Sequence, residues 1–74
     1  MIHVIKPGDL YEHYKGKQYK IIGVSCCSET LTWSVVYQAL YDNEVSEMWH
    51  RPLEMFIGNL IVDGKEVKRF VRVD

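Results

Sequence analysis

Residues 33–40 read Trp-Ser-Val-Val-Tyr-Gln-Ala-Leu, and this stretch decides the fold class of the chain. Four of the five residues from Trp33 to Tyr37 are β-branched or aromatic. Such a window disfavours a helix and favours a strand. Because side chains alternate along a strand, Tyr37 and Gln38 would lie on opposite faces, so at most one of them can line a given surface.

Short strand signals alternate with turn signals on both sides of this segment, which is the pattern of an all-β domain. Asp63-Gly64 between apolar runs predicts a hairpin, and Gly23 within a run predicts a bulge or bend. Pro52 ends one strand and starts a helical turn over residues 52–56. We expect strands over residues 10–14, 18–25, 33–40, 48–51, 59–62 and 67–73.

These elements predict a small SH3-like barrel of five to six short antiparallel strands, with one 3₁₀ or helical turn near residues 52–56. An OB-fold is the alternative, but that fold usually has a longer chain and a longer helix. With 74 residues, the chain predicts one domain over residues 1–74. Because such a domain has a thin core and this one is rich in aromatic residues, we expect a homo-oligomer.

The net charge of −1 argues against a protein that tracks duplex nucleic acid and against a polybasic membrane anchor. Two basic groups, residues 15–20 and 65–72, are interpreted as solvated strand faces and turns. No apolar run approaches the roughly 20 residues of a membrane span, and no signal peptide begins the chain. Adjacent Cys26 and Cys27 would close almost no loop as a disulfide. We therefore expect reduced thiols in a cytoplasmic protein, with no membrane contact.

Several blocks of the sequence stand out, at residues 11–17, 28–30, 35–41 and 49–56. They read Tyr-Glu-His-Tyr-Lys-Gly-Lys, Ser-Glu-Thr, Val-Val-Tyr-Gln-Ala-Leu-Tyr and Trp-His-Arg-Pro-Leu-Glu-Met-Phe. With Tyr19 and Gly23-Val24, these blocks resemble the DUF1653 family, small bacterial and phage domains without an assigned function. The resemblance implies an SH3-like barrel and almost nothing about function. Family members often carry His where this chain has Cys27.

The chemistry-bearing side chains predict neither a metal site nor a cofactor. His3, His13, His50 and the two cysteines lack the ligand spacing of a zinc site. A small hydrolase using His13 with Ser28 or Cys27 has the residue types of a nucleophilic site, but nothing resembles a nucleophile elbow. We expect no catalytic residue and keep the hydrolase as an alternative.

Polar and aromatic residues instead predict a binding surface. Tyr and Trp rings can stack on a base, Arg51 offers a planar fork to a phosphate or carboxylate, and Gln38 can read a base edge or a peptide group. Tyr37 and Trp49 could equally be core residues, and Arg51 could pair with Glu54 or Glu29. The candidate ligand-binding residues are Tyr11, His13, Tyr14, Ser28, Glu29, Thr30, Tyr37, Gln38, Tyr41, Trp49 and Arg51.

The leading hypothesis is a non-catalytic domain that binds a nucleotide or short single-stranded nucleic acid through this aromatic and arginine surface. An extension is a phage-type sponge that sequesters a nucleotide immune signal, which would be an anti-defence role. The alternative from another class is a protein–protein interaction module, because SH3-like domains take peptides in aromatic grooves.

Overall fold

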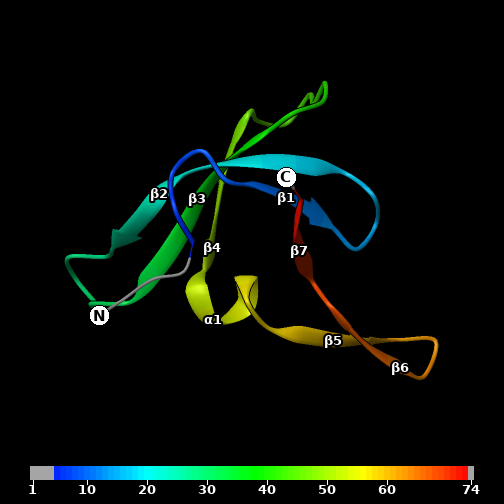
Figure 1. The fold of residues 1–74 in the computed structure, drawn as a ribbon. Helices are drawn as coiled ribbons and strands as arrows, with labels where there is room; N and C mark the ends of the chain where they lie inside the picture. The colour runs from blue at the N-terminus through cyan, green and yellow to red at the C-terminus, as the bar shows by residue number, and fades with distance from the viewer. Residues whose placement is uncertain (1–4, 74) are drawn as a thin grey trace.

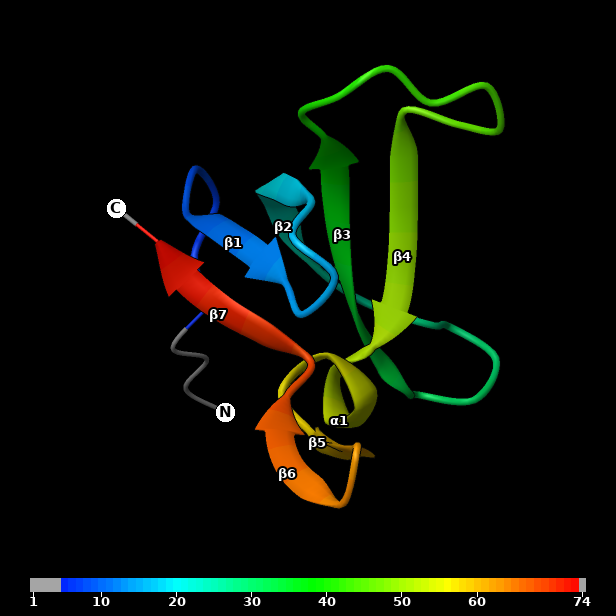
Figure 2. The same ribbon diagram turned by 90° about the vertical axis from the view of Figure 1, so that its right-hand side faces the viewer.

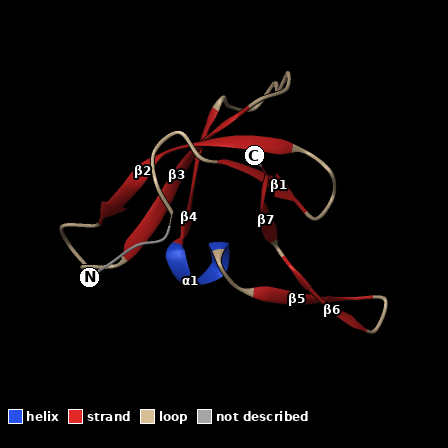
Figure 3. Cartoon of the chain, in the orientation of Figure 1, coloured by secondary structure: helices blue, strands red, loops and turns tan. Residues whose placement is uncertain are grey.

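The computed structural model describes residues 5–73, so the expectations that concern His3 and the start of the chain lie outside the described part. Within that part the chain forms strands and one short helix (Figures 1 and 3). The elements are β1 Leu10–His13, β2 Gln18–Cys26, β3 Trp33–Ala39, β4 Met48–Pro52, α1 Leu53–Phe56, β5 Asn59–Val62, β6 Lys65–Lys68 and β7 Phe70–Val73.

Five strands form one antiparallel sheet in the order β4-β3-β2-β1-β7, and β5 pairs with β6 in a separate hairpin. β2 is the longest strand and pairs with both β1 and β3. The pairing of β2 with β3 shifts register between Ile21 and Gly23, so the predicted bulge is confirmed. A bulge bends its strand and increases the local twist, and β2 crosses the molecule over the ends of β3 and β4 (Figure 1).

The expected small all-β domain of short antiparallel strands with one helical turn is confirmed, and within the described residues its sheet is not closed into a barrel. β4 and β7 are the two edges of the sheet, and no ladder joins them within residues 5–73. The chain between them forms α1 and the β5–β6 hairpin, which pairs with itself and projects to one side (Figure 2). The sheet is therefore a half-barrel with an open side between β4 and β7.

The core lies on the inner face of this half-barrel. Ile21 and Val35 are almost fully buried there, and Tyr37 is only 4% exposed. Phe56 of α1 stacks on Phe70 of β7, with ring centroids 4.1 Å apart and planes 11° apart. α1 therefore contributes an aromatic ring to the core without adding a strand to the five-stranded sheet.

The sequence predicts one strand over residues 67–73, but the structure has two strands there, the end of β6 and the whole of β7. The first residues of this segment pair with β5, whereas Phe70 to Val73 pair with β1. Arg69 lies at the division, and its N–H donates to the carbonyl of Gly58, 3.1 Å away. The two parts of this segment thus pair with two different strands.

No helix within residues 5–73 has the length and apolar character needed to cross a membrane.

Candidate functional site

Arg51 reaches across the open side of the half-barrel. It lies on β4 opposite the buried Val35 of β3, so its side chain starts from the inner face. The Cζ atom of its guanidinium lies 5.6 Å from the centroid of the Phe70 ring on β7, within range of a cation–π interaction. A side-chain contact therefore spans the two edge strands that backbone pairing leaves apart.

His13 occupies the end of β1 on the same side. Its ring lies edge-on to Phe70 at 5.0 Å and tilted against Tyr14 at 4.5 Å. Its Nδ1 accepts a hydrogen bond of 3.2 Å from the N–H of Lys15. The pKa of His13 is lowered by partial burial and by the positive charges of Arg51, Lys15 and Arg69.

These four residues, His13, Lys15, Arg51 and Arg69, form what we call the basic cluster. The fold brings them together because β7 pairs with β1, and the N–H of Tyr14 donates to the carbonyl of Arg69 at 2.9 Å. The cluster thus combines the β1–β2 turn, the end of β4 and the start of β7.

The cations of the basic cluster have no carboxylate partner within residues 5–73. The ion pair found in that part of the chain joins Arg72 to Asp9 at 3.5 Å, outside the cluster. The Nε atom of Arg69 is buried and has no hydrogen-bond partner among the described residues. Burying a donor of a charged group without a partner is costly.

Aromatic side chains frame the basic cluster. The hydroxyls of Tyr19 and Tyr41 lie 2.6 Å apart, and the Nζ of Lys17 lies 5.0 Å from the centre of the Tyr41 ring. Burial, followed by the hydrogen bond to Tyr41, raises the pKa of Tyr19. Tyr14 is 38% exposed, so its ring remains available for stacking.

The structure separates the predicted site residues into several groups. His13, Tyr14, Tyr41 and Arg51 lie in or beside the basic cluster. Tyr37 is a core residue, and Tyr11 and Trp49 are half-buried and pack against the core. Gln38 neighbours Tyr37 on β3 and therefore takes the opposite face. Ser28, Glu29 and Thr30 lie in the β2–β3 loop.

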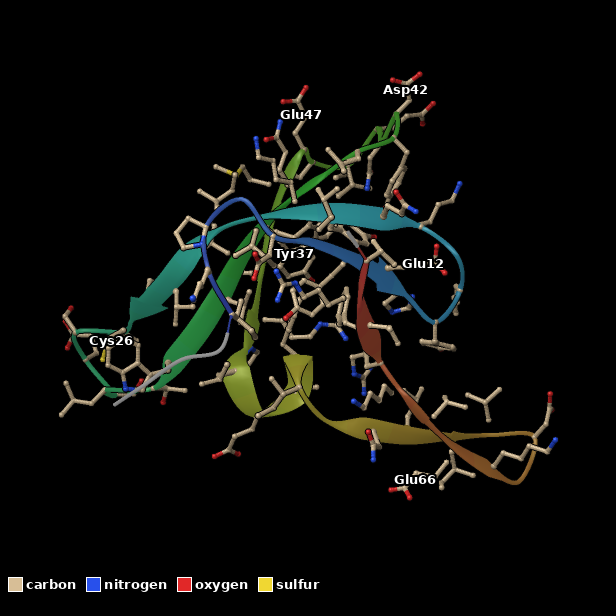
Figure 4. The ribbon with its side chains drawn as sticks, viewed as in Figure 1. Glu12, Cys26, Tyr37, Asp42, Glu47 and Glu66 are labelled. Atoms are coloured by element: carbon tan, nitrogen blue, oxygen red, sulfur yellow. The ribbon has the colours of Figure 1, made fainter. Side chains whose placement is uncertain are left out.

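The hydrolase alternative loses its geometric basis. His13 lies at the β1–β2 turn, whereas Cys27 and Ser28 follow the far end of β2. Nine strand residues separate the two places, which is about 30 Å at 3.3 Å per residue. Figure 4 shows Glu12 and Cys26 at opposite ends of the molecule. A proton transfer between His13 and these nucleophiles requires contact.

Acidic side chains gather at the β3–β4 loop, beyond Tyr41. Asp42, Glu44 and Glu47 line an open hollow of about 460 Å³ there, and Figure 4 shows Asp42 and Glu47 at the outer end of the loop. The site therefore has a basic side and an acidic side, with Tyr41 between them. No group of three metal-ligating residues occurs within residues 5–73.

Sequence reasoning missed Lys15, Arg69 and Phe70 as site residues. Both basic groups of the sequence were visible, but nothing in their spacing shows that one residue from each meets at His13. The alternative left open for Arg51, an ion pair with Glu54 or Glu29, does not form within residues 5–73. Phe70 could have been identified as a site residue only if the strand that pairs with β7 had been known.

Comparisons with known proteins agree on one family. The model of the family described as a protein of unknown function, DUF1653, matches residues 9–72. A crystal structure of a DUF1653 protein from Bordetella bronchiseptica superposes with a TM-score of 0.83 at 31% sequence identity. The match covers 95% of this chain and 88% of that one. Among curated proteins none matches the chain.

Proposed function

The chain belongs to the DUF1653 family, and we propose that it binds a small anionic ligand that carries an aromatic ring, a nucleotide or short single-stranded nucleic acid, without catalysing a reaction. One observation carries the proposal. Three cationic side chains converge on His13, and none of them has a carboxylate partner within residues 5–73.

A phosphate group suits this arrangement. The guanidinium of Arg51 presents a planar fork of donors that matches phosphate oxygens, and the Nε–H of Arg69 is a buried donor without a partner in the described chain. A bound phosphate would supply acceptors to the guanidinium of Arg51. It also offsets the repulsion among the cations that lowers the pKa of His13.

The aromatic frame suits a base. Tyr14 is partly exposed beside His13, and Tyr41 is half-buried and hydrogen-bonded to Tyr19. Stacking of a base on a protein ring contributes about 1–3 kcal/mol.

A short ligand fits better than a long polymer. The acidic side formed by Asp42, Glu44 and Glu47 follows directly on Tyr41, and a continuing phosphate backbone would meet these carboxylates. The net charge of −1 also gives no general attraction for nucleic acid. We therefore place the ligand within the basic cluster and its frame.

We propose that the biological role is sequestration, as in a phage-type sponge that removes a nucleotide immune signal from the cytoplasm. Such a role needs affinity and abundance but no reaction. The free thiols of Cys26 and Cys27 suit a reducing compartment.

Calorimetry with a panel of mononucleotides and dinucleotides tests the binding proposal. We expect saturable heat for at least one phosphorylated ligand and none for the matching nucleoside. Arg51→Gln should weaken binding by at least tenfold, because it removes the fork and keeps the length of the side chain. Lys65→Gln at the tip of the β5–β6 hairpin is the matched control and should bind like the original protein.

Two results contradict the proposal. One is the absence of heat across the whole panel at millimolar ligand. The other is unchanged affinity in an Arg51→Gln protein whose circular dichroism shows the native fold.

A second candidate function, a protein-interaction module, rests on a different surface. Leu31, Trp33, Pro52 and Leu53 line a hollow of about 420 Å³ beside α1. Leu31 is 71% exposed and holds a left-handed backbone with φ 58°, a conformation that is costly for a bulky residue. Quenching or enhancement of Trp33 fluorescence by proline-containing peptides, in a Trp49→Phe background, would favour this candidate. No change in Trp33 fluorescence with any of the peptides would contradict this candidate function.

A further inference from the structure

Two cations of the basic cluster lie over aromatic rings and not against carboxylates. The Cζ of Arg51 lies 5.6 Å from the centre of the Phe70 ring, and the Nζ of Lys15 lies 5.8 Å from the centre of the Tyr14 ring. A ring attracts a cation through its π face and occupies none of its N–H donors. Within residues 5–73 neither cationic side chain forms an ion pair or donates a hydrogen bond. Both therefore keep their charge and their donors available for a ligand.

His13 adds an uncharged donor to the cluster. Its Nδ1 accepts a hydrogen bond from the N–H of Lys15, 3.2 Å away, so the neutral ring carries its hydrogen on Nε2. This Nε2–H has no acceptor in the described part of the chain. The His13 ring lies 5.0 Å from the ring of Phe70, over which Arg51 also lies. His13 and Arg51 thus approach the same side chain of β7 from two different strands.

The charge of the basic cluster suits a doubly charged anion better than a singly charged one. Arg69 adds a third positive charge near His13 to those of Arg51 and Lys15. The neighbouring carboxylate of Glu12 lies on the other face of β1 and accepts a hydrogen bond of 3.3 Å from the side chain opposite it on β2. A phosphomonoester carries a charge of about −1.5 to −2 at pH 7, whereas a phosphodiester carries a single negative charge.

The supply of acceptor oxygens also distinguishes the two classes of phosphate. A guanidinium that binds a phosphate through two parallel hydrogen bonds occupies a pair of its oxygens. A phosphodiester then has no terminal oxygen left for His13 and Lys15, whereas a phosphomonoester has a further one. These donors belong to the end of β1 and the turn after it, whereas Arg51 belongs to β4. The monoester alone can therefore satisfy both sides of the cluster.

We propose that the basic cluster recognises a terminal phosphomonoester, an assignment that rests on the nucleotide-binding function proposed above. The ligand is then a mononucleotide or a short strand that ends in a phosphate, and not one whose phosphates are all diesters. Arg51 binds a pair of the terminal oxygens, and His13 and Lys15 donate to the remaining one. The carboxylates of the acidic side, beyond Tyr41, are compatible with such a ligand because no phosphate follows the one that is bound.

Calorimetry with matched pairs of ligands tests the proposal. Each nucleoside 5′-monophosphate is compared with its methyl phosphodiester, which has the same base and sugar but lacks one terminal oxygen and one negative charge. A monophosphate that binds should bind about tenfold or more tightly than its methyl ester, because it makes additional charge-assisted hydrogen bonds.

Variants at the β1–β2 turn test which donors bind the additional oxygen. His13→Phe keeps a ring against Phe70 and removes the Nε2 donor, so it should weaken binding of the monophosphate several-fold and leave binding of the ester unchanged. Lys15→Gln alters an exposed side chain and should act in the same direction. His50→Phe, at an exposed position of β4, is the matched control and should change neither affinity.

Equal affinity for a monophosphate and its methyl ester, or tighter binding of the ester, would overturn the proposal and leave the nucleotide-binding function in place. The same conclusion would follow if His13→Phe and Lys15→Gln proteins with native circular dichroism weakened both ligands equally. Absence of heat with every monophosphate and every ester at millimolar concentration would instead contradict the nucleotide-binding function itself, and this inference with it.

Discussion

His13 reports directly on the charge of the basic cluster. Burial and three cations lower its pKa from the ordinary value of 6.5, so the imidazole stays neutral where a solvated histidine would begin to take up a proton. Its protonation therefore provides a spectroscopic measure of the cluster that needs no ligand.

We predict that Arg51→Gln raises the pKa of His13, measured by the pH dependence of its ring resonances in NMR. Removal of one positive charge lowers the cost of protonation. Lys65→Gln, in the distant hairpin, is the control and should leave the curve in place. A bound nucleotide should also raise the pKa of His13, and binding should strengthen as pH falls from 7 toward the pKa.

The lowered pKa of His13 also determines how the stability of the fold changes with pH. The unfolded chain binds a proton at His13 near pH 6.5, before the folded protein does. The unfolded state therefore gains protons first, and His13 makes folding less favourable as the pH falls through that region. If the NMR titration curve of His13 were unchanged in Arg51→Gln protein, the claim that Arg51 lies close enough to lower the pKa of His13 would be contradicted.

At the scale of single residues, the sequence can predict the role of a site residue when that role depends on the chemistry of its own side chain alone. Arg51 is such a residue, because its planar donors suit an anion in any setting. Arg69 is not, since its importance depends on the pairing of β7 with β1. For Tyr37 the sequence left open a stacking role and a core role, and the structure shows the core role.

At the scale of elements, the turn between β5 and β6 depends on its glycine. Asp63 and Gly64 both hold positive φ, at 52° and 77°, which is the geometry of a type I′ hairpin turn. We predict that Gly64→Ala lowers the free energy of unfolding by about 1 kcal/mol, measured by urea denaturation. Gly23→Ala is the matched control. An added Cβ at Gly23 meets no atom within 4 Å, and a loss as large as that at Gly64 would refute the explanation from backbone conformation.

The outer edge of β4 is protected at its two ends. The N–H of Ala39 donates to the carbonyl of Glu47, and alternation along the ladder then turns the backbone of Met48 and His50 outward. The Oγ of Ser46 accepts from the N–H of Met48 at 3.1 Å and donates to the carbonyl of Met48 at 2.7 Å. Pro52 at the end of the strand has no N–H.

We predict that Ser46→Ala aggregates faster than the original protein during storage, because it exposes a donor and an acceptor on a strand edge. Light scattering over time measures the effect. Ser28→Ala, in the β2–β3 loop, removes a hydroxyl away from any strand edge and is the control. Equal aggregation of the two variants would show that Ser46 does not protect the edge.

The positions of the elements follow closely from local sequence, because turn residues and alternation act over a few neighbours. β5 is predicted to the residue, and the bulge at Gly23 and the helical turn after Pro52 are confirmed. The division at Arg69 could not be predicted. Apolar and basic residues are mixed on both sides of Arg69, and this pattern does not show which strand each part will pair with.

At the scale of the whole molecule, exposed apolar side chains around the β3–β4 connection suit self-association. Leu40, Val45 and Met48 are 48%, 80% and 53% exposed, and an apolar surface of this kind is typical of interaction sites. We predict a dimer or larger assembly by light scattering coupled to size-exclusion chromatography. Val45→Asp should reduce the mass toward one chain, whereas Val71→Asp on β7 should not. A monomer mass for the original protein at high concentration would contradict the prediction.

Closure of the sheet is a property of the whole chain, and the sequence pattern did not reveal it. Strand count and turn spacing are the same for a closed barrel and for this half-barrel. The difference lies in whether the segment after β4 pairs with the sheet or with itself, and here β5 pairs with β6. The open side that results is where the basic cluster lies.

The pairing of β1 with β7 brings together two strands that are far apart in the sequence. It therefore affects when the basic cluster can form during synthesis of the chain. His13 and Lys15 are synthesised more than 50 residues before Arg69 and Phe70. A nascent chain in which residues 69–73 have not yet emerged from the ribosome has all the strands of the β2–β3 and β3–β4 pairs, but its basic cluster is incomplete. The four side chains of the cluster can therefore come together only after β7 has been synthesised and has paired with β1.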